Sequence, residues 1–417
     1  MIIERNTYLQ KLIAKRHNGK IKIITGIRRC GKSFLLSTIY AGWLREHGID
    51  NEHIININLE DRRNKSLRDP DELLSYIDSK LTDDKMHYVM IDEIQLVPEF
   101  EDVLNSYLNM SNADIYVTGS NARFLSKQVR TDFAGRGEEI KLHPLTFREY
   151  ITTTQSNRTD ALRDYMIYGG LPQVVEKQSH EEKVEMLTAL FENTYIRDIV
   201  ERHAIRNTEI LDELLNILAS AIGGLTNATK LANTFVSVKH ENVSRNTIVN
   251  YIEYICDSFL MEKANRYDIK GKRYIDSPYK YYFTDCGLRN VRLNFRQVEY
   301  THLLENIIYN ELIARGFSVD VGVVPKQTRL DNGERHRQYF EVDFVCNKGS
   351  QRYYIQSAYK MADEEKMRQE QASLINIDDS FKKIIILGEY TPVLHNTHGI
   401  TIIGIYDFLL NENSLEL

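Results

Sequence analysis

The chain has 417 residues, of which 42% are hydrophobic and 27% charged, and its formal net charge is −6. This length predicts two or three soluble domains, and the acidic balance argues against a protein that coats nucleic acid over its whole surface. No apolar run approaches the ~20 residues of a membrane span, so we expect no membrane partner. The four cysteines lie far apart, which disfavours a disulfide framework or a zinc site and predicts a cytoplasmic protein with reduced thiols.

The first motif lies between an apolar run, residues 21–26, and a helical pattern that ends at Gly48. It fits the phosphate-binding pattern G-x-x-x-x-G-K-[ST] in the strand–loop–helix context that this pattern requires. Lys32 is predicted to reach the β- and γ-phosphates and Ser33 to bind Mg²⁺. We therefore expect ATP and Mg²⁺ as cofactors, bound by Gly26, Ile27, Arg28, Arg29, Cys30, Gly31, Lys32, Ser33 and Phe34.

Two adjacent arginines, Arg28 and Arg29, occupy variable positions of this loop. Their partner is left open between a phosphate, an acidic neighbour such as Glu60 and a carboxylate elsewhere in the chain. Cys30 is interpreted as a small filler.

A short apolar strand, residues 88–91, is followed by Asp92 and Glu93. In parallel α/β sheets, ligands bind at the carboxyl ends of the strands. Asp92 is therefore predicted to hold Mg²⁺, and Glu93 to polarise the attacking water as a general base. The carboxylate of Glu93, directly after Asp92, favours an ATPase that hydrolyses ATP over a protein that only binds it.

The next strand, residues 113–121, ends in polar side chains, and we expect Asn121 to orient the lytic water; the alternative is that Asn121 belongs to an ordinary turn at the end of the strand. Arg130 and Arg136 follow in a glycine-bounded loop. One of them is predicted to act as an arginine finger, a cation that stabilises the charge of the transferring phosphoryl group, and we favour Arg136.

The blocks "GIRRCGKS", "VMIDEIQ", "VTGSNARFLS", "FAGRGEEIKLHPLTFREY" and "GGLPQVV" occur in this order. Together with "YYFTDCGLRN" and "YFEVDFVCNK", they resemble the bacterial and archaeal AAA+-type ATPases that carry a C-terminal domain of unknown function. The resemblance covers nearly the whole chain. It implies an additional-strand ATPase core, a helical lid, a winged helix and a nuclease-like C-terminal domain. It also implies that Gly170 and Pro172 contact the nucleotide base; the alternative is that they only end a helix.

The middle of the chain predicts three helices, the second capped by Thr226 and the third by Ser244, and then two strand-like runs. This is the order of a winged helix. A DNA reader would place the third helix in the major groove and let the basic residues of the strand pair contact phosphates. The alternative is a solvated edge in a module that contacts protein.

The last third contains a helix with Glu305 and a strand with Asp343, as in restriction-endonuclease-like metal sites. The E-x-K expected on the following strand is replaced by Gln356-Ser357-Ala358. Lys360 lies two residues beyond. We interpret the domain as a nuclease-like scaffold that has lost cleavage.

The predicted architecture is thus α/β, with a P-loop AAA+-type parallel sheet (1–145), a helical lid (146–205), a winged helix (206–292) and an α/β nuclease-like domain (293–417). The predicted function is Mg-dependent ATP binding and hydrolysis that drives a switch or motor, with duplex DNA as a candidate partner through the winged helix. A homo-oligomer is also considered. The alternative is a scaffold ATPase that switches a protein–protein assembly without nucleic acid.

Overall fold

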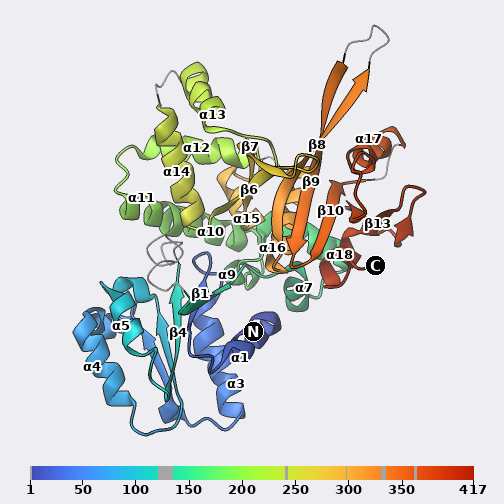
Figure 1. Ribbon diagram of the computed structural model, residues 1–417. Helices are drawn as coiled ribbons and strands as arrows, with labels where there is room; N and C mark the ends of the chain where they lie inside the picture. Colours follow the sequence, from blue (N-terminus) through green and yellow to red (C-terminus); the bar gives the residue numbers. More distant parts are fainter. Residues whose placement is uncertain (1, 121–134, 240–242, 297, 330–334, 361–363) are drawn as a thin grey trace. The chain divides into compact units, whose positions relative to one another are not determined.

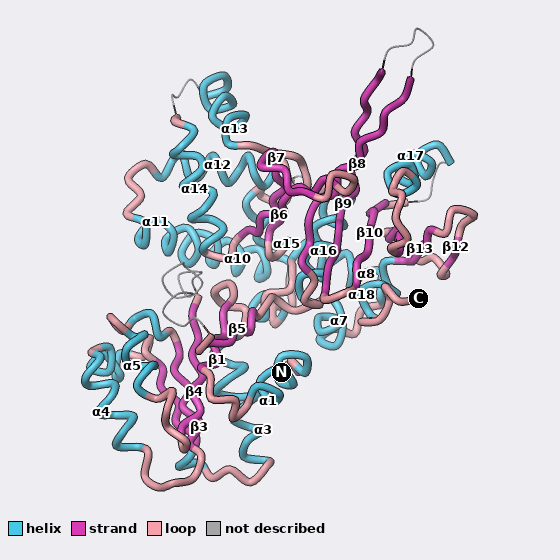
Figure 2. The backbone as a smooth tube through the Cα atoms, viewed as in Figure 1, coloured by secondary structure: helices cyan, strands magenta, loops and turns pink. Residues whose placement is uncertain are grey.

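The computed structural model describes residues 2–120, 135–239, 243–296, 298–329, 335–360 and 364–417. Its backbone divides into two compact units, the first comprising residues 1–144 with Asp257–Phe259, and the second the remainder (Figures 1 and 2). Among the described helices, none is both long and apolar enough to cross a membrane.

The first unit is built on a parallel sheet with the strand order β2-β3-β4-β1-β5. Its strands are Ile21–Thr25 (β1), Ile54–Asn58 (β2), His87–Asp92 (β3), Ala113–Gly119 (β4) and Gly137–Lys141 (β5). The predicted strands around residues 21–26, 88–91 and 113–121 are confirmed. Because β4 lies between β1 and β3, the strand that leads to the phosphate loop is separated from the strand that ends in Asp92.

Helices cover both faces of this sheet, with α1 and α3 on one side and α4 and α5 on the other (Figure 1). The helical segments are Asn6–Lys15 (α1), Lys32–Phe34 (α2), Leu35–Tyr40 (η1), Ala41–Glu46 (α3), Asn51–His53 (η2), Arg62–Arg68 (η3), Pro70–Lys80 (α4), Ile94–Leu96 (η4) and Phe100–Ser106 (α5). Segments α2, η1 and α3 follow one another without a break, which confirms the helix predicted up to Gly48.

A buried ion pair lies inside this unit. The Lys22 side chain is fully buried on β1, and its ammonium donates to the carboxylate of Asp114 on β4. The same carboxylate accepts a 2.7 Å hydrogen bond from the Tyr116 hydroxyl and a 3.2 Å hydrogen bond from the backbone N–H of His17. Every charge in the pair therefore has a partner, which is the condition under which buried charges are tolerated.

The second unit begins with a run of helices and contains further helices between and after its strands. Its helices are Phe147–Tyr150 (α7), Ile151–Thr153 (η6), Arg158–Tyr168 (α8), Pro172–Val175 (α9), His180–Leu190 (α10), Phe191–Ile196 (η7), Arg197–His203 (α11), Thr208–Ser220 (α12), Ala228–Thr234 (α13), Phe235–Lys239 (η8), Arg245–Asp257 (α14), Cys286–Arg292 (α15), Tyr300–Ala314 (α16), Glu364–Ile375 (α17) and Ile405–Leu410 (α18).

The three helices predicted for the middle of the chain are confirmed as α12, α13 and α14, and Ser244 accepts from the backbone N–H of Thr247, as expected of a cap. The predicted cap of α13 is wrong by one residue. The Asn227 side chain, rather than that of Thr226, accepts from the N–H of Lys230 at 2.7 Å.

An eight-stranded sheet with the order β12-β13-β11-β10-β9-β8-β6-β7 runs through the rest of this unit. Its strands are Met261–Asp268 (β6), Arg273–Phe283 (β7), Ser318–Arg329 (β8), Arg335–Lys348 (β9), Gln351–Ala358 (β10), Lys382–Leu387 (β11), Leu394–His395 (β12) and Ile400–Gly404 (β13). The hairpin β6–β7, predicted as the wing, also pairs with β8 over Arg266–Asp268. The strand pair that follows the three helices is thus continuous with the C-terminal sheet.

Two apolar clusters lie against this sheet. One combines the strands with residues of α7, α8, α16 and α18, among them Leu304, Ile308 and Phe408. The other includes Leu374 on α17, which packs with Val342 and Ile385 of the strands. The sheet is therefore covered by helices on both sides, which accounts for its Ile- and Val-rich central strands.

The blocks "GGLPQVV" and "TDCGLRN" meet in space at the buried carboxylate of Asp285. Asp285 caps α15 by accepting from the N–H of Leu288 at 3.2 Å, and it accepts from the N–H of Gly170 at 2.7 Å. A Cβ at Gly169 would come within 2.0 Å of this carboxylate, and Gly169 also has φ +75°. Gly169 is therefore required for the close approach of two segments about 115 residues apart.

Burial raises the pKa of Asp285 to about 6, although the N–H groups that it accepts from act in the opposite direction. The folded chain therefore binds a proton more tightly than the unfolded chain between pH 4 and 6, so the free energy of unfolding falls as pH rises through this window. The Asp285→Asn substitution should remove this pH dependence, on the order of 3 kcal/mol, while keeping an acceptor oxygen. Unfolding of both proteins at pH 4.5 and 7 measures it. An unchanged difference between the two pH values would contradict it.

Candidate functional site

The phosphate-loop motif forms a tight turn between β1 and the helix that begins at Lys32. Gly26 has φ +141°, and a Cβ there would come within 2.1 Å of the carbonyl oxygen of Leu142. Gly31 has φ +103° at the helix N-cap. Both glycines thus occupy conformations that side chains disfavour, as the motif predicts for a loop whose backbone closes around a phosphate.

Two elements place the side chains of Lys32, Ser33 and Asp92 at one edge of the sheet: α2 carries the first two, and β3 ends in the third. The Lys32 ammonium donates to the carbonyl oxygens of Gly26 at 3.0 Å and Ile27 at 3.2 Å. The Ser33 hydroxyl lies 2.9 and 2.8 Å from the two carboxylate oxygens of Asp92. The loop and the end of β3 are therefore in direct contact.

Asp92 is held from its other side by β4. Its Oδ1 accepts a 2.5 Å hydrogen bond from the hydroxyl of Thr118, which in turn accepts from the backbone N–H of Glu93 at 2.9 Å. Burial raises the pKa of Asp92, and the hydroxyls of Thr118 and Ser33 counteract this by stabilising the charged form. Hydroxyl and carboxylate oxygens side by side are ligands that Mg²⁺ prefers, so this pair fits the ion.

Glu93 is buried and has a left-handed backbone conformation, with φ 56° and ψ 49°. Its Oε2 accepts a 3.0 Å hydrogen bond from the Ser120 hydroxyl and a second from the Gln95 side-chain amide. The strand end that was expected to orient water therefore supplies, at Ser120, a group that positions Glu93. Gln95 was missed by the sequence analysis.

One of the alternatives left open for the loop arginines is realised. The Arg28 guanidinium lies 2.6 Å from a carboxylate oxygen of Glu60, in a partly exposed ion pair. Arg29 is exposed and has φ +65°. Cys30 is fully buried, as expected of a filler, and burial raises the pKa of its thiol.

Arg5 supports the loop from outside the motif and was not predicted. Its buried guanidinium donates to the carbonyl oxygens of Cys30 at 3.4 Å and His143 at 2.7 Å. It thus connects the loop to the segment after β5. A single arginine in a polar N-terminal stretch gives no pattern that would indicate this contact.

The remaining predicted catalytic residues have different outcomes. Asn121 and Arg130 lie outside the described residues. Arg136 is exposed, and its carbonyl oxygen accepts from the N–H of Ile21 at the start of β1. The phosphate loop follows the other end of β1, about 16 Å away along the strand. The backbone position of Arg136 therefore favours a partner other than the phosphates of its own loop.

Gly170 and Pro172 are accounted for within the second unit. The Gly170 carbonyl accepts from the N–H of Leu145 at 2.8 Å, and Pro172 is the first residue of α9. Their predicted contact with the nucleotide base stays a prediction.

The nuclease-like carboxylates gather around a lysine from a different strand. The buried ammonium of Lys280 on β7 lies 2.8 Å from Glu305 on α16, 2.8 Å from Glu341 and 3.6 Å from Asp343, both on β9. Tyr282 adds a 2.7 Å hydrogen bond to the Glu305 oxygen that Lys280 contacts. Burial, with Asp343 as the next cause, raises the pKa of Glu305 to about 7.

These residues do not fit a catalytic divalent cation. The ammonium of Lys280 already lies among the three carboxylates, where a cation would bind. The second oxygen of Asp343 accepts from both the hydroxyl and the N–H of Ser357, each at 2.9 Å. Gln356 replaces the expected carboxylate, and its amide group bonds to the Asp343 N–H and to Glu370. Lys360, considered as a substitute, is exposed.

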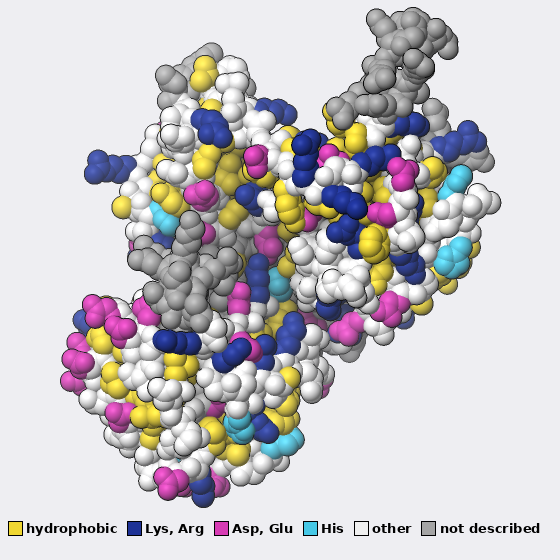
Figure 3. Space-filling model, in the orientation of Figure 1, with side chains coloured by type: hydrophobic (Ala, Val, Ile, Leu, Met, Phe, Trp, Pro, Cys, Tyr) yellow, Lys and Arg dark blue, Asp and Glu magenta, His cyan; other side chains and the backbone are white. Residues whose placement is uncertain are grey.

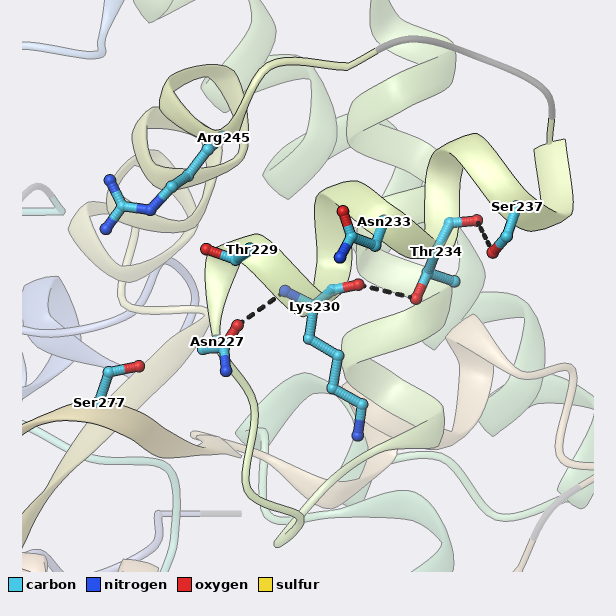
Figure 4. Close-up of a pocket in the computed structure, with 8 residues that line it drawn as sticks. All are labelled: Asn227, Thr229, Lys230, Asn233, Thr234, Ser237, Arg245 and Ser277. Atoms are coloured by element: carbon cyan, nitrogen blue, oxygen red, sulfur yellow. Dashed lines mark hydrogen bonds between the residues drawn. The ribbon is translucent and has the colours of Figure 1, made fainter.

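A polar pocket of about 730 Å³ lies beside α13, the start of α14 and β7 (Figure 4). Lys230 and Arg245 are its cations, and Thr229, Asn233 and Ser277 add hydroxyl and amide groups. Among the described residues that line it there is no carboxylate. Figure 3 shows basic and acidic side chains interspersed on one face of the second unit, whereas the described lining of the pocket has two cations and no carboxylate.

Comparison with known proteins agrees with the phosphate-loop geometry. A family model described as "AAA domain" matches residues 18–151, and one described as a domain of unknown function (DUF8612) matches residues 159–299. An uncharacterised protein of Haemophilus influenzae is 35% identical over 98% of this chain and 99% of its own length. One of Methanocaldococcus jannaschii is 30% identical over 84% of this chain and 77% of its own length.

The fold and the phosphate loop define residues 18–151 as an AAA-type P-loop domain. The chain belongs to the family of the Haemophilus influenzae and Methanocaldococcus jannaschii proteins. Among solved structures, the Aeropyrum pernix ORC2 protein in its ADP form shows 12% identity over 71% of this chain and 92% of that chain. Its TM-score of 0.35 is too low to support a conclusion.

Replacing Lys280 by Met should destabilise the second unit by about 3–5 kcal/mol near pH 8, because it leaves buried carboxylates without their counter-ion. At pH 5.5 the loss should be smaller, since protonation of Glu305 removes one negative charge. Denaturant unfolding at the two pH values measures both effects. Glu341→Gln is the matched control: its side chain is 35% exposed, so a much smaller loss is expected. Equal losses in both variants would contradict the central role of Lys280.

Proposed function

We propose that the chain binds Mg-ATP at the phosphate loop, hydrolyses it, and uses the cycle to switch its own conformation. The observation that carries the proposal is the contact of Ser33 with Asp92, 2.8 and 2.9 Å between the hydroxyl and the carboxylate oxygens. It joins the loop motif to the carboxylate motif 59 residues later in the chain. Chance matches to either motif give no reason for the two to meet.

The residues have distinct roles in this proposal. The N–H groups of the loop and the ammonium of Lys32 bind the β- and γ-phosphates. Ser33 and Asp92 are the residues that hold Mg²⁺, which when bound neutralises phosphate charge. Glu93 accepts the proton of the attacking water, and its hydrogen bond to Ser120 orients the carboxylate. Arg136 remains a candidate arginine finger, with its backbone position favouring the nucleotide of a neighbouring subunit.

The proposed target of the switch is duplex DNA, contacted through the pocket beside α13 and α14. Two cations and several neutral donors, with no carboxylate among the described lining residues, suit phosphate oxygens. The helix order α12–α13–α14 followed by β6–β7 supports the same assignment. The second candidate is a protein assembly switched without nucleic acid, which the net charge of −6 favours.

The Lys32→Ala substitution should abolish nucleotide binding, because it removes the cation that reaches the phosphates. Glu93→Gln should bind ATP normally and hydrolyse it about 10²–10⁴-fold more slowly, since the amide cannot accept the proton. Nucleotide binding by calorimetry and phosphate release separate the two steps. Ser37→Ala is a control at an exposed position of the same helix. Full turnover in Glu93→Gln would remove its assignment as the base.

If the pocket binds DNA, Lys230→Ala and Arg245→Ala should each weaken duplex binding. Each should also lower the slope of log affinity against log salt by about 1. Fluorescence anisotropy over a salt series, with and without ATP, measures this. Arg197→Ala is the control, since it removes an exposed arginine on α11 that pairs with Glu201. Absence of duplex binding at low salt would leave the protein assembly as the target of the switch.

A further inference from the structure

A cluster of potential metal ligands lies at the edge of the first sheet that is opposite to the phosphate loop. It consists of His53, which directly precedes β2, Asp83 in the connection after α4, and His87, the first residue of β3. Their ligand atoms all lie within 4.8 Å of one another. Strands β2 and β3 are parallel neighbours, and Ile54 pairs with Tyr88. The two histidines therefore lie at the starts of adjacent strands.

His87 is the independent observation that points to a ligand. Its side chain is fully buried, and both ring nitrogens lack a hydrogen-bond partner. Within the described part of the chain, it is the one side chain with two such atoms. A buried polar atom without a partner costs about 1–3 kcal/mol. Asp83 does not remove this cost, because its Oδ1 lies 3.9 Å from the Nε2 atom of His87, beyond hydrogen-bond distance.

The separations match those of a tetrahedral metal site. Zinc binds imidazole nitrogen and carboxylate oxygen at about 2.0–2.1 Å, so neighbouring ligand atoms are about 3.3 Å apart. His53 Nε2 lies 3.2 Å from the Asp83 oxygens, and His87 Nε2 lies 3.9 Å from Oδ1. The separation of His87 Nε2 from Asp83 Oδ1 is about 0.6 Å longer than this value, and the ligand atoms of the two histidines lie within 4.8 Å of one another. Metal binding therefore requires the His87 ring to move toward the other two groups.

We propose that His53, Asp83 and His87 bind a divalent transition-metal ion, with Zn²⁺ as the probe of choice. Two imidazoles and one carboxylate are a ligand set that zinc accepts, and water completes the fourth position. The wide spacing of the four cysteines, which disfavoured a zinc site in the sequence, does not bear on a site built from histidine and aspartate.

A simpler account explains only part of the cluster. His53 and Asp83 alone form an ordinary hydrogen bond, which needs no metal. That account leaves both nitrogens of His87 buried beside them, with the two imidazole rings 4.8 Å apart between centroids. A metal ion satisfies one nitrogen of each histidine at once. Asp83 is 40% exposed and gives the ion a route from solvent.

The position of the site indicates a structural role. His87 and Asp92 are the two ends of β3, about 16 Å apart, so the ion does not contact the nucleotide. The Asp83 segment is otherwise held by the amide of Asn112, which donates to the Asp83 carbonyl oxygen at 3.0 Å. A bound ion adds a second tie between this segment and the starts of β2 and β3.

Titration of the full chain with Zn²⁺ in excess Mg²⁺ and without nucleotide tests the proposal. Wild type should bind one ion, and its Tm should rise by about 5 °C or more at 100 times the Kd. Asp83→Asn and His87→Gln should each weaken binding at least tenfold. Asp84→Asn, an exposed neighbour, and His47→Gln are the matched controls and should bind as wild type does.

Two outcomes would overturn the proposal. One is a wild-type chain that binds no zinc at millimolar concentration, and the other is binding that persists in both Asp83→Asn and His87→Gln. Because Asp83 is an exposed residue, its substitution tests the site even if His87→Gln fails to fold. Co²⁺ gives a second readout, since the visible spectrum of a tetrahedral nitrogen–oxygen complex should appear in wild type and in both controls.

Discussion

The hydrogen bonds to Asp92 connect three elements that lie far apart in sequence. Ser33 approaches from the helix after the phosphate loop, Thr118 from β4, and Asp92 itself ends β3. Because a carboxylate in a buried position needs such donors to stay charged, the three elements hold one another in place. Removing the hydroxyl of Ser33 or of Thr118 raises the free energy of the charged carboxylate. Asp92 is then protonated more readily, and a protonated carboxyl group binds a cation less well.

Local motifs were sufficient to predict that the loop residue Ser33 and the strand-end residue Asp92 belong to one site. The glycine spacing, Lys32 and the acidic pair after β3 each have a physical reason within a few residues of chain, and the parallel strand order then brings them to one edge. Contacts from outside the motifs were not predictable. Arg5 reaches Cys30 and His143 across 25 and 138 residues, and no periodicity marks it.

The lysine that accompanies the C-terminal carboxylates lies at a position where the sequence did not indicate it. The sequence analysis searched for a lysine on the strand after Asp343 and considered Lys360. The ammonium comes instead from Lys280, 63 residues before Asp343. Lys280 and Tyr282 face the same side of β7, and both contact Glu305. A lysine inside an aromatic strand was a signal of burial, but the strand was interpreted as an exposed wing.

The glycine pair near residue 170 illustrates a different limit. The resemblance to related ATPases assigned Gly170 and Pro172 to the nucleotide base, and that assignment stays a prediction. The close approach of Asp285 gives Gly169 a separate physical reason to be a glycine. Sequence alone could not separate these roles, because both require a residue without a side chain. The N–H of Gly170 donates to Asp285, 115 residues later, and no sequence pattern connects the two positions.

Buried polar groups elsewhere in the chain show how strongly His87 departs from the usual pattern. Lys22 is matched by Asp114, Lys280 by three carboxylates, and Asp285 by backbone N–H groups. In each case at least one partner comes from a segment far away in the sequence, so the fold supplies it as a consequence of packing. His87 has a carboxylate and a second imidazole beside it, yet neither donates to it nor accepts from it at hydrogen-bond distance. A cation between the three groups would give one ring nitrogen of His87 the partner that it lacks.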